Sequence, residues 1–149
     1  LEKYKTKNEI VDFKTISILF GTQTGNSEIV AREAEKVARK AGLTPTVMDL
    51  SECETETLIS SPRLLIITST YGEGEMPDNV KYLWDSCNSL DDNFYQNVNY
   101  SVLALGDTSY EKFCEAGKLW DFHLNEKGGK RILDVLNAML TLRNRHVNG

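Results

Sequence analysis

Three short segments of this chain are rich in Gly, Ser, Thr and Tyr, residue types that bind small polar ligands through hydroxyls, rings and accessible backbone. They are residues 21–27, 69–77 and 106–114. The first reads Gly-Thr-Gln-Thr-Gly-Asn-Ser and stands between an apolar run and a helix-like segment. The unpaired N–H groups and positive dipole of a helix N-terminus favour a phosphate at such a place. Further hydroxyl donors come from Thr22, Thr24 and Ser27.

The first segment differs from the common nucleotide-binding loops. It lacks the GxxxxGK[ST] and GxGxxG spacings, and no Lys or Arg lies between Gly21 and Ser27. A site made of hydroxyls and amides alone suits a terminal phosphate monoester that is bound and not transferred. Taken alone, the segment also fits a plain capped turn, which is the more common structure.

The second and third segments each supply an aromatic side chain. In the second segment, Gly72 and Gly74 let the chain turn tightly. Tyr71, which stands just before these glycines, offers a ring for stacking. Tyr110 offers a second ring in the third segment. Each segment alone is equally typical of a surface loop. Together, a phosphate site and two aromatic platforms predict a phosphorylated, planar, redox-active ring, and a flavin with a ribityl phosphate tail fits this description.

The pattern of apolar residues predicts where these segments lie in the fold. Strands are predicted at residues 16–20, 46–50, 64–68 and 100–105, and helices at 27–41, 78–87, 115–127 and 133–142. Strands that alternate with helices imply a parallel sheet with helices on both faces. Ligands of such sheets bind beyond the carboxyl ends of the strands, where all three segments would meet.

Composition limits the class of protein. We expect one domain over residues 1–149, because the chain has 149 residues and 40% are hydrophobic. The net charge of −5 argues against nucleic acid and is compatible with a basic protein partner. The odd number of widely spaced cysteines, three, argues against a disulfide framework or zinc site and favours a reducing, cytoplasmic setting. No signal peptide or membrane-spanning apolar run is visible.

At these segments the sequence resembles the FMN domain of the diflavin reductases, which include the sulfite reductase flavoprotein and the NADPH–cytochrome reductases. The matching runs are Thr-Gln-Thr-Gly-Asn-Ser at 22–27, Ser-Thr-Tyr-Gly-Glu-Gly at 69–74 and Leu-Gly-Asp-Thr-Ser-Tyr-Glu-Lys-Phe-Cys at 105–114. They occur in the family's order, within a resemblance that covers roughly residues 15 to 132. The resemblance implies a flavodoxin-like α/β sandwich whose parallel sheet has four to five strands in the order 2-1-3-4-5.

The resemblance also implies which residues bind FMN. The first run would hold the phosphate, Tyr71 and Tyr110 would flank the flavin, and the third run would hydrogen-bond its edge. The residues implied are Thr22, Gln23, Thr24, Gly25, Asn26, Ser27, Ser69, Thr70, Tyr71, Gly72, Leu105, Gly106, Asp107, Tyr110, Phe113 and Cys114.

The chain departs from the family after Gly-Gly-Lys-Arg-Ile, where members continue into a further acidic strand and a terminal helix. Here Leu133-Asp134 leads almost directly into Val135-Leu136. We therefore expect the fifth, edge strand to be absent or very short, and an acidic residue that the family places near the flavin has no counterpart.

The resemblance implies an electron carrier, either the FMN domain of a longer diflavin reductase or a small stand-alone shuttle such as cindoxin. The donor would be an FAD- and NADPH-containing reductase module, and the acceptor a haem or sirohaem protein. No catalytic acid, base, nucleophile or metal is required, since the cofactor does the redox chemistry. We expect an acidic rim for partner docking, made of Glu73, Glu75, Asp78, Asp91, Asp92, Glu111 and Glu115.

Two alternatives from other classes remain at this point. One is a quinone or nitro reductase that transfers two electrons to a small substrate. The other is a phosphoacceptor signalling domain, which needs an acceptor Asp after the central strand. That strand ends here in Thr68-Ser69-Thr70-Tyr71, so the second alternative is disfavoured.

Overall fold

The computed structural model describes residues 3–6, 9–12, 14–21, 26–69, 78–105 and 115–133. Its strands are β1 (Lys3–Thr6), β2 (Glu9–Asp12), β3 (Thr15–Gly21), β4 (Thr44–Asp49), β5 (Arg63–Ser69), β6 (Asn99–Leu105) and β7 (Lys130–Leu133). Its α-helices are α1 (Asn26–Lys40), α2 (Lys81–Ser86) and α3 (Glu115–Glu126). Short 3₁₀ turns are η1 (Leu50–Glu52), η2 (Thr55–Ile59), η3 (Asp78–Val80) and η4 (Cys87–Ser89).

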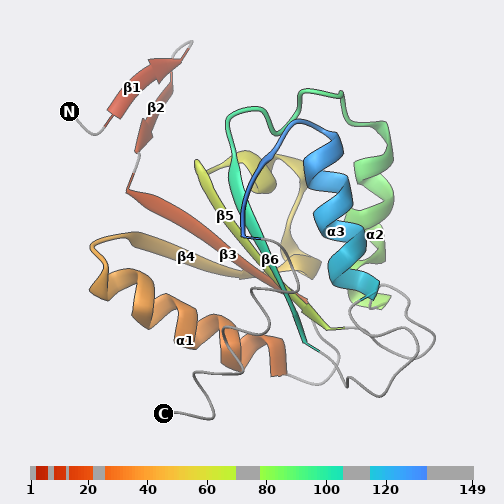
Figure 1. The fold of residues 1–149 in the computed structure, drawn as a ribbon, viewed down its shortest axis with the longest axis horizontal. Helices are drawn as coiled ribbons and strands as arrows, with labels where there is room; N and C mark the ends of the chain where they lie inside the picture. The colour runs from red at the N-terminus through yellow and green to blue at the C-terminus, as the bar shows by residue number, and fades with distance from the viewer. Residues whose placement is uncertain are drawn as a thin grey trace.

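The main sheet has five parallel strands in the order β4-β3-β5-β6-β7. Counted along the chain, this is the predicted order 2-1-3-4-5, so the flavodoxin-like fold class is confirmed. Helix α1 covers one face of the sheet, and α2 and α3 lie side by side on the other (Figure 1). The middle strand β5 is buried at Leu64, Ile66 and Ile67, as its continuous apolar run predicted.

The four strands predicted from apolar runs are all present; three are extended by one or two residues, and the strand predicted at 46–50 runs from Thr44 to Asp49, with Leu50 in η1. The predicted helix at 78–87 is shorter than expected, because η3 and η4 take up its two ends. Of the helix predicted at 133–142, Leu133 instead ends β7, and the remaining residues fall outside the described part of the chain. The hairpin β1-β2 was not predicted and forms a separate two-stranded antiparallel sheet, which projects from the body of the domain (Figure 1).

The edge strand β7 is present and short, with four residues paired in parallel to β6. Its Arg131 donates two hydrogen bonds, both of 2.8 Å, to the carboxylate of Asp121 on α3. The hydroxyl of Tyr100 on β6 donates to the backbone oxygen of Asp121 at 3.1 Å. These contacts tie the edge of the sheet to α3, which compensates for the few backbone hydrogen bonds that so short a strand can make.

Glycines end two of the helices. After α1, the N–H of Gly42 donates to the Arg39 oxygen and that of Leu43 donates to the Ala38 oxygen. This pairing closes the helix by placing Gly42 at φ +87°. Gly128 repeats the arrangement after α3 at φ +96°, with the N–H of Gly128 donating to the Asn125 oxygen and that of Gly129 to the Leu124 oxygen.

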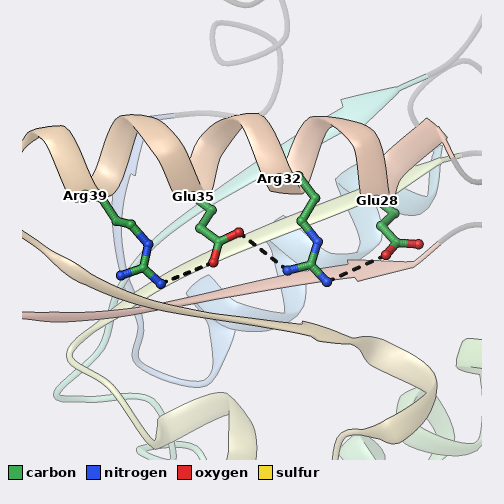
Figure 2. Close-up of polar contacts among 4 residues, drawn as sticks. All are labelled: Glu28, Arg32, Glu35 and Arg39. Atoms are coloured by element: carbon green, nitrogen blue, oxygen red, sulfur yellow. Dashed lines mark hydrogen bonds and ion pairs between the residues drawn. The ribbon is translucent and has the colours of Figure 1, made fainter.

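Helix α1 is supported along its solvent side by alternating charges. Figure 2 shows Arg32 between Glu28 and Glu35, with Arg39 on the far side of Glu35. The nitrogen–oxygen distances are 3.4–3.7 Å. Exposed pairs of this spacing each stabilise a helix by about 0.3–0.5 kcal/mol. The ladder therefore helps a helix whose N-terminus faces the predicted phosphate site.

Candidate cofactor site

The carboxyl ends of β3, β5 and β6 lie next to one another in the sheet. Gly21 at the end of β3 is in register with Thr68 of β5, and Thr68 is in register with Ala104 of β6. One residue further on, Ser69 is in register with Leu105. The three loops that the sequence singled out therefore leave the sheet from three neighbouring strands at one edge.

Helix α1 is joined closely to the end of β3. The hydroxyl of Ser27, which is fully buried, donates to the backbone oxygen of Gly21 at 3.2 Å. The hydrogen bond holds the first turn of α1 against the end of β3. Its effect is to point the free N–H groups at the start of α1 toward the edge where the loops begin.

Gly21 is required by close packing. A Cβ at this position would lie 2.9 Å from Cγ2 of Val80 and 3.0 Å from Cδ1 of Leu50. Any larger residue would push η3 and η1 away from the strand end, so the first loop starts here with glycine. Sequence reasoning assigned Gly21 to the end of a strand and missed this packing role.

Four of the predicted cofactor-binding residues fall within the described part of the chain. Asn26 and Ser27 open α1, Ser69 ends β5 and Leu105 ends β6. The others lie outside the described residues, and their roles stay predictions: Thr22, Gln23, Thr24, Gly25, Thr70, Tyr71, Gly72, Gly106, Asp107, Tyr110, Phe113 and Cys114. The four that are described all sit at the edge from which the loops leave.

One further polar group at this edge was not predicted. The side chain of Thr68 is fully buried, and its Oγ1 has no hydrogen-bond partner among the described residues. A buried hydroxyl without a partner is unfavourable in an apolar environment.

The predicted acidic rim is only partly correct. Asp78 opens η3, whose Val80 packs beside Gly21, so it does lie at the carboxyl edge. Asp91 and Asp92 lie at the opposite edge of the sheet, where Asp92 pairs with Lys127 beyond the end of α3 at 3.5 Å. In the sequence, Asp91 and Asp92 follow a predicted helix. The sequence does not show that this helix runs from the carboxyl ends of the strands to their amino ends.

Acidic residues also line a groove of about 180 Å³ between η2 and α2. Glu54 and Glu56 lie on one side, and Tyr82 in the first turn of α2, with 85% of its surface exposed, lies on the other. Turn η1, which contacts both α2 and η3, connects the groove with the strand end at Gly21. Sequence reasoning did not single out these three residues.

A second cluster of titratable side chains includes the half-buried His123 on α3 and the buried Tyr95 before β6. The Tyr95 hydroxyl lies 2.8 Å from Nε2 of His123, whose ring packs edge-on against Trp84 and Trp120. Burial, with a smaller contribution from the charge of Lys127, lowers the pKa of His123 to about 4. Its imidazole is therefore neutral at pH 7 and serves as a packing and hydrogen-bonding group.

The surroundings of the two described cysteines disfavour the reactive thiolate form of their side chains. Cys53 and Cys87 are both buried free thiols. Burial raises the pKa of Cys87 to about 11, and burial together with Asp49 and Glu52 raises that of Cys53 to about 12. Over the same residues, no group of His, Cys, Asp and Glu side chains has the arrangement of a metal site, and no helix is long and apolar enough to cross a bilayer.

Comparison with known proteins agrees with this geometry. The flavodoxin family profile matches residues 18–145. The chain belongs to the flavodoxin family. Among solved structures, a cysteine mutant of flavodoxin from Pseudomonas aeruginosa is 28% identical with a TM-score of 0.72, and the match covers 89% of this chain and 90% of that one. Flavodoxin from Streptococcus pneumoniae TIGR4 is 26% identical with a TM-score of 0.73, over 81% of each chain.

This flavodoxin domain is similar to one part of a larger protein. The sulfite reductase [NADPH] flavoprotein alpha-component of Bacillus subtilis is 41% identical over 119 residues, and that of Vibrio cholerae is 37% identical over 123. These matches cover 80% and 83% of this chain, which spans only about a fifth of either relative. The resemblance to their flavoprotein domain is confirmed, and FMN is the cofactor of the family.

Proposed function

We propose that this flavodoxin domain is a one-electron carrier between two protein partners. The donor is an FAD- and NADPH-containing reductase module, and the acceptor is a haem or sirohaem protein. The observation that supports the proposal is the register of Gly21, Thr68 and Ala104, which ends three neighbouring strands at one edge, where the predicted ligand-binding loops begin. The names of the sulfite reductase relatives support the choice of partners.

The residues of the chain bind and orient the cofactor. The first-turn amides of α1, held in place by Ser27, and the loop at 22–27 hold the phosphate. As the sequence resemblance implies, Tyr71 and Tyr110 would flank the ring, and the 105–114 segment would hydrogen-bond its polar edge. Bound FMN supplies the redox chemistry by taking up and releasing electrons singly. The protein needs no acid, base or nucleophile of its own.

Partner docking uses the acidic surface next to the cofactor edge. The groove of Glu54, Glu56 and Tyr82 is joined through η1 to the strand end at Gly21. A basic partner guided by these charges would approach the side of the domain that holds the flavin. Buried free thiols at Cys53 and Cys87 support a reducing, cytoplasmic location. We propose that residues 1–149 act as one unit.

The first experiment tests cofactor binding and carrier chemistry together. Purified protein is mixed with FMN, desalted, and examined for retained flavin absorbance. The loaded protein is then reduced anaerobically and mixed with cytochrome c, a basic haem protein used as a probe acceptor. Retained flavin and rapid haem reduction are expected. Loss of flavin on desalting would contradict the proposal, as would fast NADPH oxidation by the isolated chain with a quinone, which indicates a two-electron enzyme.

A further inference from the structure

Two buried tyrosines of this fold differ in what their hydroxyl groups contact. The side chains of Tyr95 and Tyr100 are both fully buried. The hydroxyl of Tyr100 donates to the backbone oxygen of Asp121 at 3.1 Å, and a backbone carbonyl does not take up the proton of a phenol. The hydroxyl of Tyr95 lies 2.8 Å from Nε2 of His123, which is a base. Of the two contacts, the one at Tyr95 therefore allows proton transfer.

At neutral pH the proton of this pair is on the phenol. Burial raises the pKa of Tyr95 above its ordinary range, so the hydroxyl stays protonated. The neutral ring of His123 has one nitrogen free to accept a proton. Cys87 also lies within hydrogen-bonding reach of the Tyr95 hydroxyl, but a thiol sulfur is a weaker acceptor than an imidazole nitrogen. Because an oxidised phenol is a strong acid, Tyr95 releases its proton to His123 when its ring loses an electron.

Two tryptophans connect this pair with the surface of the α2–α3 layer. Trp84 of α2 is partly exposed, and its ring lies edge-on to the fully buried ring of Trp120 on α3, with centroids 4.8 Å apart. Both rings also contact the ring of His123, at centroid distances of 5.6 and 6.1 Å. Trp120 Nε1 has no hydrogen-bond partner among the described residues, so an oxidised Trp120 has no group to take its proton. Oxidation that begins at Trp84 is therefore passed inward to Tyr95, where the base lies.

We propose that Tyr95 and His123 form a redox site of the polypeptide itself, at which Tyr95 is oxidised by one electron and passes its phenolic proton to His123 Nε2. The electron leaves through Trp120 and Trp84 to an oxygen-centred radical at the surface, such as a peroxyl radical. The peroxyl radical is reduced to the peroxide anion, which takes a proton from water, and Tyr95 becomes a neutral tyrosyl radical beside protonated His123. The site removes radicals from the α2–α3 surface and does not depend on the proposed cofactor.

The test is flash oxidation of the purified protein by ruthenium tris(bipyridine) with a cobalt(III) quencher. The tyrosyl radical is followed by its absorbance and by EPR in a Cys87→Ala/Tyr82→Phe background, which removes a thiol that would reduce the radical and a phenol that is 85% exposed. We expect radical formation to slow in D₂O, and to slow by about 100-fold in His123→Gln, the lower end of what a positioned base contributes. Gln keeps a hydrogen bond to Tyr95 without taking its proton, so a merely structural role of His123 would leave the rate unchanged.

Further variants assign the radical to one side chain. Tyr95→Phe should remove the D₂O-sensitive signal, and Trp84→Phe should lower its yield. The matched control is Tyr100→Phe, which removes a buried hydroxyl that contacts a carbonyl and should leave the signal intact. Urea denaturation checks that each variant is folded, and if His123→Gln does not fold, the comparison of Tyr95→Phe with Tyr100→Phe decides the question. A signal that persists in Tyr95→Phe, or that forms equally fast with His123 and with Gln, would overturn the inference.

Discussion

The buried hydroxyl of Ser27 donates to the backbone oxygen of Gly21 at 3.2 Å and so fastens the first turn of α1 to the end of β3. Replacing Ser27 by Ala leaves that buried oxygen without its donor. We expect Ser27→Ala to lower the free energy of unfolding by roughly 1–3 kcal/mol. FMN binding should weaken as well, because the N-terminus of α1, which we propose binds the phosphate, is no longer held at the end of β3.

Urea denaturation and fluorescence titration check this prediction. The control is Ser51→Ala, which changes the same residue type at an exposed position in η1. Equal stability and equal FMN affinity for Ser27→Ala and the wild type would show that the hydrogen bond does not hold the turn.

Acid should destabilise the fold through His123. Its pKa is about 4 in the folded protein and about 6.5 when unfolded, so the unfolded chain binds more protons between these values. The stability contributed by the neutral ring is complete above about pH 6.5 and is lost as the pH falls toward 4. We expect a loss of about 1–2 kcal/mol, allowing for solvent screening of a half-buried ring.

Denaturation curves at pH 7.5, 6 and 4.5 measure this effect. The comparison is with His123→Gln, which can still hydrogen-bond the Tyr95 hydroxyl but does not titrate. The variant should show a flatter dependence on pH. Parallel curves for both proteins would assign the acid sensitivity to other groups.

The acidic groove should speed electron transfer to a basic partner. We expect Glu54→Gln/Glu56→Gln to slow the second-order reduction of cytochrome c roughly three- to tenfold at low salt, with the difference vanishing at high salt because exposed charges are screened. Stopped-flow mixing with the FMN-loaded, reduced protein measures the rate.

The matched control is Asp91→Asn/Glu126→Gln, which changes the net charge equally at the opposite edge of the sheet. It should have a much smaller effect. If both double variants slow the reaction alike, net charge and not the groove governs the encounter. The Tyr82→Ser variant tests separately whether the exposed ring of Tyr82 contributes to the docked complex.

The buried thiols should resist labelling. Burial raises the pKa values of Cys53 and Cys87 to about 12 and 11, so almost no thiolate is present at pH 8. In a Cys114→Ser background, we expect no reaction with a disulfide reagent in the folded protein and two equivalents after denaturation. Prompt labelling of the folded protein would show that one of these sites opens readily.

The core strands were predictable because their burial on both faces leaves continuous apolar runs, as at residues 64–68. The edge strand β7 was hard to predict, since Lys130 and Arg131 replace the apolar run that marks an inner strand. The hairpin β1-β2 has no such run either. The position of Asp92 could not be predicted, because it depends on the direction in which α2 and α3 cross the sheet.

Sequence alone predicted the parallel α/β fold, the FMN cofactor and the loops proposed to bind it, because all of these follow from local patterns of residue type and spacing. Only the tertiary structure decided which groups meet. Strand register placed Thr68 between Gly21 and Ala104 and left its hydroxyl buried and unpaired. Register and burial depend on contacts between residues distant in the chain, and no local pattern encodes them.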